Sequence, residues 1–230
     1  MTVTVIGLLV ALGLPSLLAW VRRGEAEGRA KQLRRLATAW AGCGALLALV
    51  LLWERRPLAS IGIALAAPNY LAWLGGAALG LTMLALTVVG LIQASRAGKE
   101  VRSEGLTRLL DMPLWFRCAV PLTAGITEEI MFRGYPIERL HELTGSLWLA
   151  ALLPLAVFTL AHLGSWSWRH LAGVAFAGTL LTGLYLWQRD LIACMIAHAI
   201  IDSSLIFLPA LMKKLAARRD QRFSSITASR

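Results

Sequence analysis

Residues 112–133 read MPLWFRCAVPLTAGITEEIMFR, an apolar run that ends with two adjacent carboxylates and an arginine. The run is long enough to cross a lipid bilayer as a helix. Its charged end holds Glu128, Glu129 and Arg133. Charged side chains are costly inside a bilayer, so ionisable residues within a spanning segment mark a candidate functional site.

The composition of the whole chain is that of a membrane protein. Of its 230 residues 57 % are hydrophobic and 16 % are charged, and the mean hydropathy is +0.65. Soluble domains usually carry about 25 % charged residues. A segment in the bilayer must satisfy its own backbone hydrogen bonds, and the alternating pattern of a membrane β-barrel is absent. We therefore predict an all-α, polytopic helical bundle.

Apolar runs near the spanning length of about 20 residues predict about seven transmembrane helices. We expect one membrane domain over residues 1–211, without an internal repeat, and a basic cytoplasmic tail over residues 212–230. Gly76 and Gly80 have the spacing of close helix packing. Because no basic residue precedes the first apolar run, we interpret it as an anchor and not as a signal peptide. The predicted helices cover residues 2–20, 36–53, 71–93, 114–133, 147–163, 171–187 and 191–211.

The basic residues are distributed unevenly between the two ends of the predicted helices. Of the 23 lysines and arginines, 18 lie near the connections after the first, third and fifth helices or in the tail. The positive-inside rule then predicts a multi-pass protein of the cell membrane with its N-terminus outside and its C-terminus inside. The net charge of +10 accordingly indicates topology and contact with membrane lipid headgroups, and no nucleic acid partner is expected.

Several common motifs are absent. His141-Glu142 begins like a zinc-protease helix, but the second histidine of H-E-x-x-H is missing. The sequence has no nucleophile elbow, P-loop or dinucleotide fingerprint. The three cysteines are too far apart to indicate a disulfide framework or a metal knuckle. They are Cys43, Cys118 and Cys194.

The two glutamates have different expected roles. Glu129 and Arg133 are four residues apart, so on a helix they can pair along one face, whereas Glu128 points about 100° away. Arg133 can therefore hold Glu129 in place and leave Glu128 for a cavity, a division that suits acid–base chemistry. A pair that only locks two helices together is an equally good interpretation of Glu129 and Arg133 alone.

Two further pairs have one-turn spacing on later apolar segments. Phe158 precedes His162 by four residues and can pack beside its imidazole, and His198 precedes Asp202 by four residues. A lone histidine in a membrane helix more often bonds a backbone carbonyl, but polar groups on three separate helices exceed what a structural network usually needs. The remaining histidines lie in predicted interfacial stretches, where we expect them to be solvated: His141 and His170.

Taken together and in order, these motifs resemble the signature of the CAAX-protease and bacteriocin-processing family of glutamic-type intramembrane endopeptidases, also called the Abi family. The motifs are Glu128-Glu129-x-x-x-Arg133, then Phe158-x-x-x-His162, then His198-x-x-x-Asp202. The resemblance covers residues 112–208. Asp202 occupies a position where the family has Asn or Asp.

The resemblance implies hydrolysis of a peptide bond in a cavity among the four C-terminal helices. Glu128 would be the general base, and His162 would help to orient or polarise the attacking water. His198 and Asp202 would face the oxyanion as hydrogen-bond donors, although an ionised Asp202 would more plausibly orient His198. The candidate catalytic set is Glu128, Glu129, His162, His198 and Asp202, with Arg133 and Phe158 in support.

No cofactor is expected, but a zinc variant of the site is possible. Its ligands would be Glu128, His162 and His198, with the fourth position left for water. No close-spaced pair of ligands supports this variant, and we favour the metal-free glutamate mechanism.

The predicted helix boundaries raise a geometric difficulty. At 1.5 Å per residue, Glu128 lies ~6 Å and His198 ~10 Å from the outer ends of their helices, but His162 lies ~22 Å from its outer end. These residues could not meet. We therefore expect a long or kinked fourth helix that continues through His141.

The expected partner is a peptide or protein substrate with a C-terminal processing signal. A cavity open to the cytosol would suit prenylated C-terminal peptides, whereas an outward opening would suit the C-terminal sorting tails of exported proteins. The short chain and the outward N-terminus slightly favour the second. Two other functions would use the same residues, an ion-coupled transporter and a non-catalytic immunity or assembly partner. The transporter interpretation lacks the repeated halves that such proteins usually show.

Overall fold

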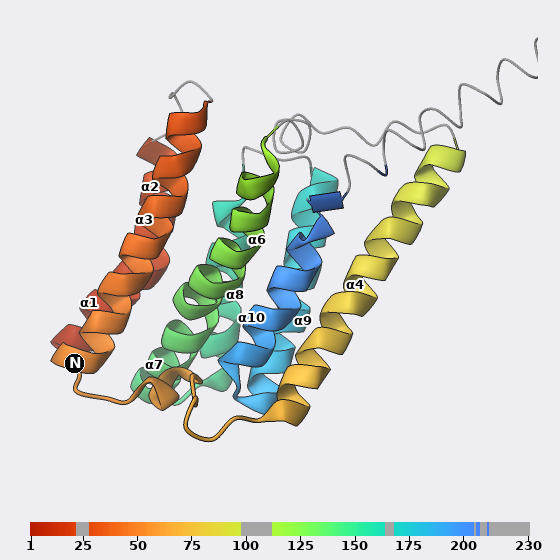
Figure 1. Ribbon diagram of the computed structural model, residues 1–230. Coiled ribbons are helices and arrows are strands. Elements are labelled where there is room, and N and C mark those ends of the chain that lie inside the picture. The colour runs from red at the N-terminus through yellow and green to blue at the C-terminus, as the bar shows by residue number, and fades with distance from the viewer. Residues whose placement is uncertain (22–27, 98–111, 164–167, 205, 208–210, 212–230) are drawn as a thin grey trace, which may run out of the picture.

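The chain forms a bundle of helices that lie side by side (Figure 1), in a computed structural model that describes residues 1–21, 28–97, 112–163, 168–204, 206–207 and 211. These residues contain helices and no strand, which confirms the predicted all-α membrane bundle. The helical elements are α1 (Thr2–Leu8), η1 (Leu9–Gly13), α2 (Leu14–Val21), α3 (Arg29–Ala48), η2 (Leu49–Trp53), η3 (Leu58–Ile61), α4 (Tyr70–Arg96), α6 (Leu114–Glu129), η4 (Ile130–Gly134), α7 (Tyr135–Thr144), α8 (Leu147–Ala161), α9 (Trp168–Gln188) and α10 (Leu191–Asp202).

Each of the seven predicted segments coincides with a helix, but several boundaries differ. The second begins at Arg29 and not at residue 36, because residues 29–35 are good helix formers whose charge hides them from an apolar criterion. The fourth continues through η4 and α7 to Thr144, which confirms the expected long helix. The predicted tail, residues 212–230, lies outside the described residues.

The surface of the bundle is suited to lipid. Three helices in the described chain are long and apolar enough to cross a membrane, and three shorter helices are also apolar. Tryptophan and tyrosine favour the two membrane interfaces, and here the exposed rings of this kind among the described residues, apart from Trp40 within α3, stand at helix ends. At one end they are Trp53, Tyr70, Trp148 and Trp187, between 63 % and 78 % exposed, and at the other end Trp115 and Trp168.

The two ends of the bundle differ in charge. α2, α4 and α8 end, and α3, α6 and α9 begin, at the upper end in Figure 1. Arg29, Arg96 and Arg117 stand at this end. The opposite end is formed by η3, by the turn between α7 and α8, and by the turn between α9 and α10. We refer to the upper end as the basic end.

Close packing against α4 fixes the position of α10. A Cβ atom added at Gly76 would lie 2.2 Å from the Ala193 carbonyl oxygen, and one added at Gly80 would lie 2.8 Å from the Ala197 oxygen. Such distances are far below van der Waals contact, so only glycine fits at these positions. Gly76 and Gly80, the pair predicted for close helix packing, therefore let α10 pack directly on α4. α10 carries His198.

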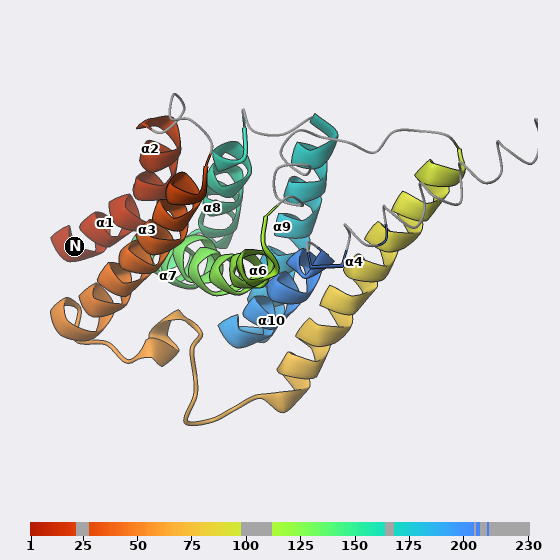
Figure 2. The same cartoon turned by 45° about the horizontal axis from the view of Figure 1, so that its top comes forward.

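The N-terminal helices are fastened to α7 by a buried polar cluster. The Tyr135 hydroxyl donates to Glu54 Oε1 at 2.8 Å, and Arg139 Nη2 lies 2.8 Å from Glu54 Oε2. Arg139 is fully buried, so this pair ties the end of the long fourth helix to the segment after η2. Figure 2 shows α7 close to α1.

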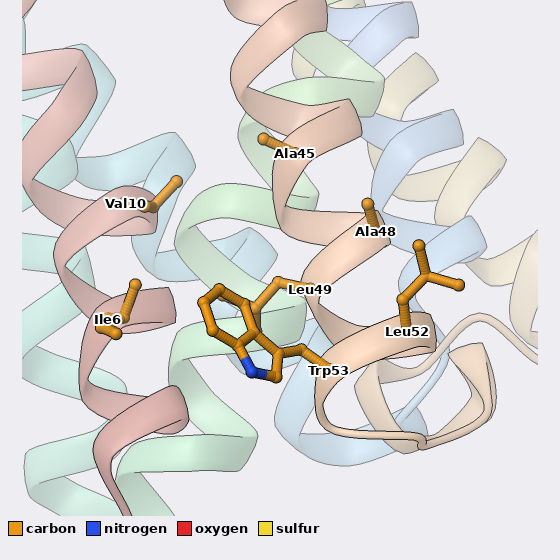
Figure 3. Close-up of a pocket in the computed structure, with 7 residues that line it drawn as sticks. All are labelled: Ile6, Val10, Ala45, Ala48, Leu49, Leu52 and Trp53. Carbon is orange, nitrogen blue, oxygen red and sulfur yellow. The ribbon is translucent and has the colours of Figure 1, made fainter.

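A pocket of about 400 Å³ lies between the first two helical segments (Figure 3). All of its lining residues are of apolar types and none is ionisable, so it offers no acid or base for catalysis. The lining residues are Ile6, Val10, Ala45, Ala48, Leu49, Leu52 and Trp53.

Candidate active site

The candidate site lies where α6 and α10 approach each other closely. A Cβ atom added at Gly125 would lie 3.0 Å from the Ala199 backbone nitrogen and 3.1 Å from the Met195 carbonyl oxygen. Gly125 stands one turn before the two glutamates, and Met195 one turn before His198. The missing side chain therefore lets the two motif-bearing helices meet backbone to backbone.

Glu129 is the buried centre of the site. It has no exposed surface, and its Oε1 accepts from Arg133 Nη1 at 2.9 Å and from His198 Nδ1 at 2.6 Å. An ionised carboxylate can only accept hydrogen bonds, so Nδ1 of His198 carries a proton. Arg133, Glu129 and His198 thus form one chain of charged hydrogen bonds that joins α6, η4 and α10.

The opposite nitrogen of His198 faces two more carboxylates. Nε2 lies 3.6 Å from Asp202 Oδ2 and 3.9 Å from Glu128 Oε2, distances of ion pairs without a direct hydrogen bond. The side chains of Glu128 and Asp202 are 31 % and 33 % exposed. The sequence left two roles for Asp202, a donor to the oxyanion or the residue that orients His198. In the structure the direct hydrogen bond to the His198 ring is made at Nδ1 with Glu129, and Asp202 lies on the Nε2 side.

Phe158 packs against three polar residues of the site. Its ring is 4.9 Å from the His162 ring and 6.4 Å from the His198 ring, measured between centroids. The Arg133 guanidinium carbon lies 4.2 Å from the ring centroid, a cation–π contact. The expected packing of Phe158 beside His162 is thus present, and the contact with Arg133 is additional.

His162 is held by its own helix. It is the C-cap of α8, and its Nδ1 lies 2.9 Å from the Phe158 carbonyl oxygen. A carbonyl oxygen only accepts, so Nδ1 donates and the neutral ring keeps Nε2 as an acceptor. This leaves His162 able to accept a proton or a hydrogen bond from water.

His170 is less exposed than the sequence indicated. We expected it to be solvated, but in the first turn of α9 it is partly buried, near enough to His162 and Asp202 to be influenced by their charges. No helical spacing within the sequence indicates how α8 and α9 pack, so this burial could not be predicted.

A π-helical stretch continues the helix directly after the two glutamates. η4 spans Ile130–Gly134 and contains Arg133. A π-helical stretch shifts the register of the side chains that follow it; the described chain has two others, η1 and η2, away from the site. Residues 129–137 are all buried, so the site is closed below Glu129, towards the end opposite the basic end.

The donor set does not fit a metal ion as it is arranged. Among the described residues no three His, Cys, Asp or Glu side chains are gathered closely enough to hold one. This includes Glu128, His162 and His198, the ligands of the zinc variant. Nδ1 of His198 is also already bonded to Glu129.

The comparison with protein families agrees with this geometry. Residues 110–204 match the model of the type II CAAX prenyl endopeptidase Rce1-like family. The match covers 95 of the 230 residues, less than half of the chain. The matched stretch is similar to that family, includes all seven motif residues and confirms the resemblance seen in the sequence. It supports an intramembrane endopeptidase in general terms and a membrane environment. Neither the curated proteins nor the solved structures include a match to this chain.

Proposed function

We propose that the chain is an intramembrane endopeptidase that hydrolyses a peptide bond with a water molecule activated by Glu128. The observation that supports this most is the buried Arg133–Glu129–His198 chain, which directs Nε2 of His198 towards Glu128 and Asp202. The same space thus holds a partly exposed carboxylate to act as base and a fixed imidazole to donate a hydrogen bond.

The reaction follows from the positions of these groups. Glu128 takes a proton from water, and the water oxygen attacks the carbonyl carbon of the substrate. The negative charge that develops on the carbonyl oxygen is stabilised by the Nε2 proton of His198. Three carboxylates surround the His198 ring, and their charge favours the imidazolium that carries this proton. Glu128 then returns its proton to the leaving amine, so the proton count balances.

Asp202 and His162 assist in separate ways. Asp202 lies 3.6 Å from Nε2 of His198, where an ionised carboxylate stabilises the imidazolium. His162 keeps Nε2 as an acceptor, because Nδ1 is bonded to the Phe158 carbonyl, and it can orient the attacking water. No step in this scheme passes through a metal ion.

The substrate approaches, we infer, from the basic end. His162 ends α8, His170 lies in the first turn of α9 and Asp202 ends α10, so the polar residues beyond His198 extend towards the basic end. The opposite side is closed by buried residues 129–137. If the positive-inside rule places the basic end in the cytosol, the substrate is a membrane-associated C-terminal tail on that side. This favours a CAAX-type substrate over the exported sorting tails preferred from the sequence.

The test is cleavage, in proteoliposomes, of prenylated C-terminal peptides and unprenylated sorting-type tails by wild type and Glu128→Ala. His141→Ala is the matched control, because His141 lies in α7 away from the site motifs. We expect cleavage by wild type and control only, with prenylated peptides preferred, and no effect of a zinc chelator. Cleavage by Glu128→Ala at the wild-type rate would refute the mechanism. Loss of cleavage with chelator would favour zinc, and no cleavage of any tail would favour a transporter or an immunity partner.

A further inference from the structure

We infer that Gly178 of α9 is a positioning residue for the site, because it leaves the space that the Arg133 guanidinium needs. The inference rests on the proposed function and extends it to a helix that carries none of the motif residues. A Cβ atom added at Gly178 would lie 3.2 Å from Arg133 Nη2 and 3.3 Å from Phe158 Cδ1. Gly178 itself is buried.

Packing holds most of the Arg133 guanidinium in place. The Arg133 side chain is 1 % exposed, and Nη1 pairs with Glu129 at 2.9 Å. Among the described residues neither Nε nor Nη2 has a hydrogen-bond partner. One face of the group is covered by the Phe158 ring at 4.2 Å. The bond to Glu129 therefore fixes the Nη1 edge of the guanidinium. The rest of the group is held by the shape of the space between Phe158 and Gly178, which we call the slot.

The slot controls the orientation of His198 through Glu129. Distances of 3.2 and 3.3 Å are tighter than nearly all real Cβ contacts, so an alanine at position 178 forces Arg133 or Phe158 to move by a few tenths of an ångström. Glu129 Oε1 accepts from both Arg133 and His198, so a shift of the guanidinium is passed to the imidazole. A small misplacement of groups that position the reaction lowers the rate of the chemical step.

The chain offers two matched controls for Gly178→Ala on the same helix. Gly173 and Gly183 are exposed, and a Cβ atom at either position meets nothing within 4 Å. We expect Gly178→Ala to lower kcat roughly tenfold with KM unchanged, while Gly173→Ala and Gly183→Ala behave as wild type. Equal kcat values for all three variants, or a change confined to KM, would overturn the inference.

A double-mutant cycle distinguishes the route through Arg133 from general packing. Arg133→Lys keeps the positive charge beside Glu129 but removes Nη2, the atom that a Cβ at position 178 would meet. We expect Gly178→Ala to lower the thermal unfolding midpoint in detergent by a few degrees in the wild-type background and to add nothing to Arg133→Lys. Additive effects of the two substitutions would refute the coupling.

Leu155 provides the competing explanation. Its Cδ1 would lie 2.9 Å from the added Cβ atom, so Gly178→Ala could act by disturbing the packing between α8 and α9. If Leu155→Ala restored the kcat of Gly178→Ala, the effect would be one of packing and the inference would be wrong. The unfolding cycle requires no substrate. Should wild type cleave no tail at all, the proposed function fails while the cycle still decides the role of Gly178.

Discussion

The buried ion pair between Arg133 and Glu129 allows a quantitative test, because the chain contains a second pair of similar length in a different environment. Arg133 Nη1 lies 2.9 Å from Glu129, with side chains that are 1 % and 0 % exposed. Arg56 Nη1 lies 2.7 Å from Glu142, and both of these side chains are 44 % exposed. The two pairs differ in burial, and each carboxylate keeps one further partner, His198 for Glu129 and Arg139 for Glu142.

The expected cost of breaking each pair follows from that difference. Arg133→Met leaves Glu129 buried with only one of the two hydrogen bonds to its Oε1, the one with His198. Removal of one partner of a buried ion pair costs about 3–5 kcal/mol. The substitution also removes the cation–π contact with Phe158. Arg56→Met removes an exposed pair, which is worth about 0–1 kcal/mol. We therefore expect Arg133→Met to destabilise the protein by several times as much as Arg56→Met.

The assay is reversible unfolding of the purified protein in mixed micelles as the denaturing detergent fraction is raised. A third variant, Glu129→Gln with Arg133→Met, removes both charges together. We expect it to be more stable than Arg133→Met alone, because no uncompensated buried carboxylate remains. Equal destabilisation by Arg133→Met and Arg56→Met, or no recovery in the double variant, would refute the view that burial of this pair holds the site together.

Three further outcomes are expected. Glu128→Gln abolishes cleavage but leaves the unfolding midpoint within a degree or two of wild type, because the side chain is 31 % exposed and only loosely paired; a large fall in the midpoint would make Glu128 a structural residue. Gly76→Ala disturbs the packing of α10 on α4 and lowers both stability and activity, because its Cβ would lie 2.2 Å from the Ala193 oxygen. Gly75→Ala is the control and leaves both unchanged, because its Cβ would meet nothing within 4 Å. Cleavage by wild type continues when a zinc chelator is present; a loss that added zinc reverses would argue for the metal variant.

The fold could be predicted from the sequence because membrane helices are specified locally. Each apolar run contains its own hydrogen bonds, so length and composition located all seven helical segments. The error at Arg29 has the same cause: an apolar criterion does not detect a helical turn made of charged helix formers. The long fourth helix followed from geometry, because Glu128, His162 and His198 could not otherwise meet.

Contacts within one helix could also be predicted, whereas contacts between helices could not. The spacing of Glu129 and Arg133 gave the ion pair that the structure contains. The bond from His198 to Glu129 depends on how α6 and α10 are rotated, and that is set by the close approach at Gly125 and by the π-helical turn after Glu129. Neither feature has a distinctive sequence pattern, and the same holds for the slot at Gly178 and for His170.

The site contains three carboxylates, and their surroundings assign each a different role. Glu129 is fully buried and bonded to both Arg133 and His198, whereas Asp202 is 33 % exposed and 3.6 Å from Nε2 of His198. Asp202→Asn should therefore retain much of the activity, because Glu128 and Glu129 still stabilise the imidazolium and the new amide can donate a hydrogen bond to the oxyanion. Glu129→Gln should lose nearly all of the activity. A neutral amide between Arg133 and His198 carries no negative charge to stabilise the protonated imidazole. Rates of cleavage by the two variants, compared at equal amounts of folded protein, test this order. A reversed order would mean that Asp202, and not Glu129, orients the imidazole during catalysis.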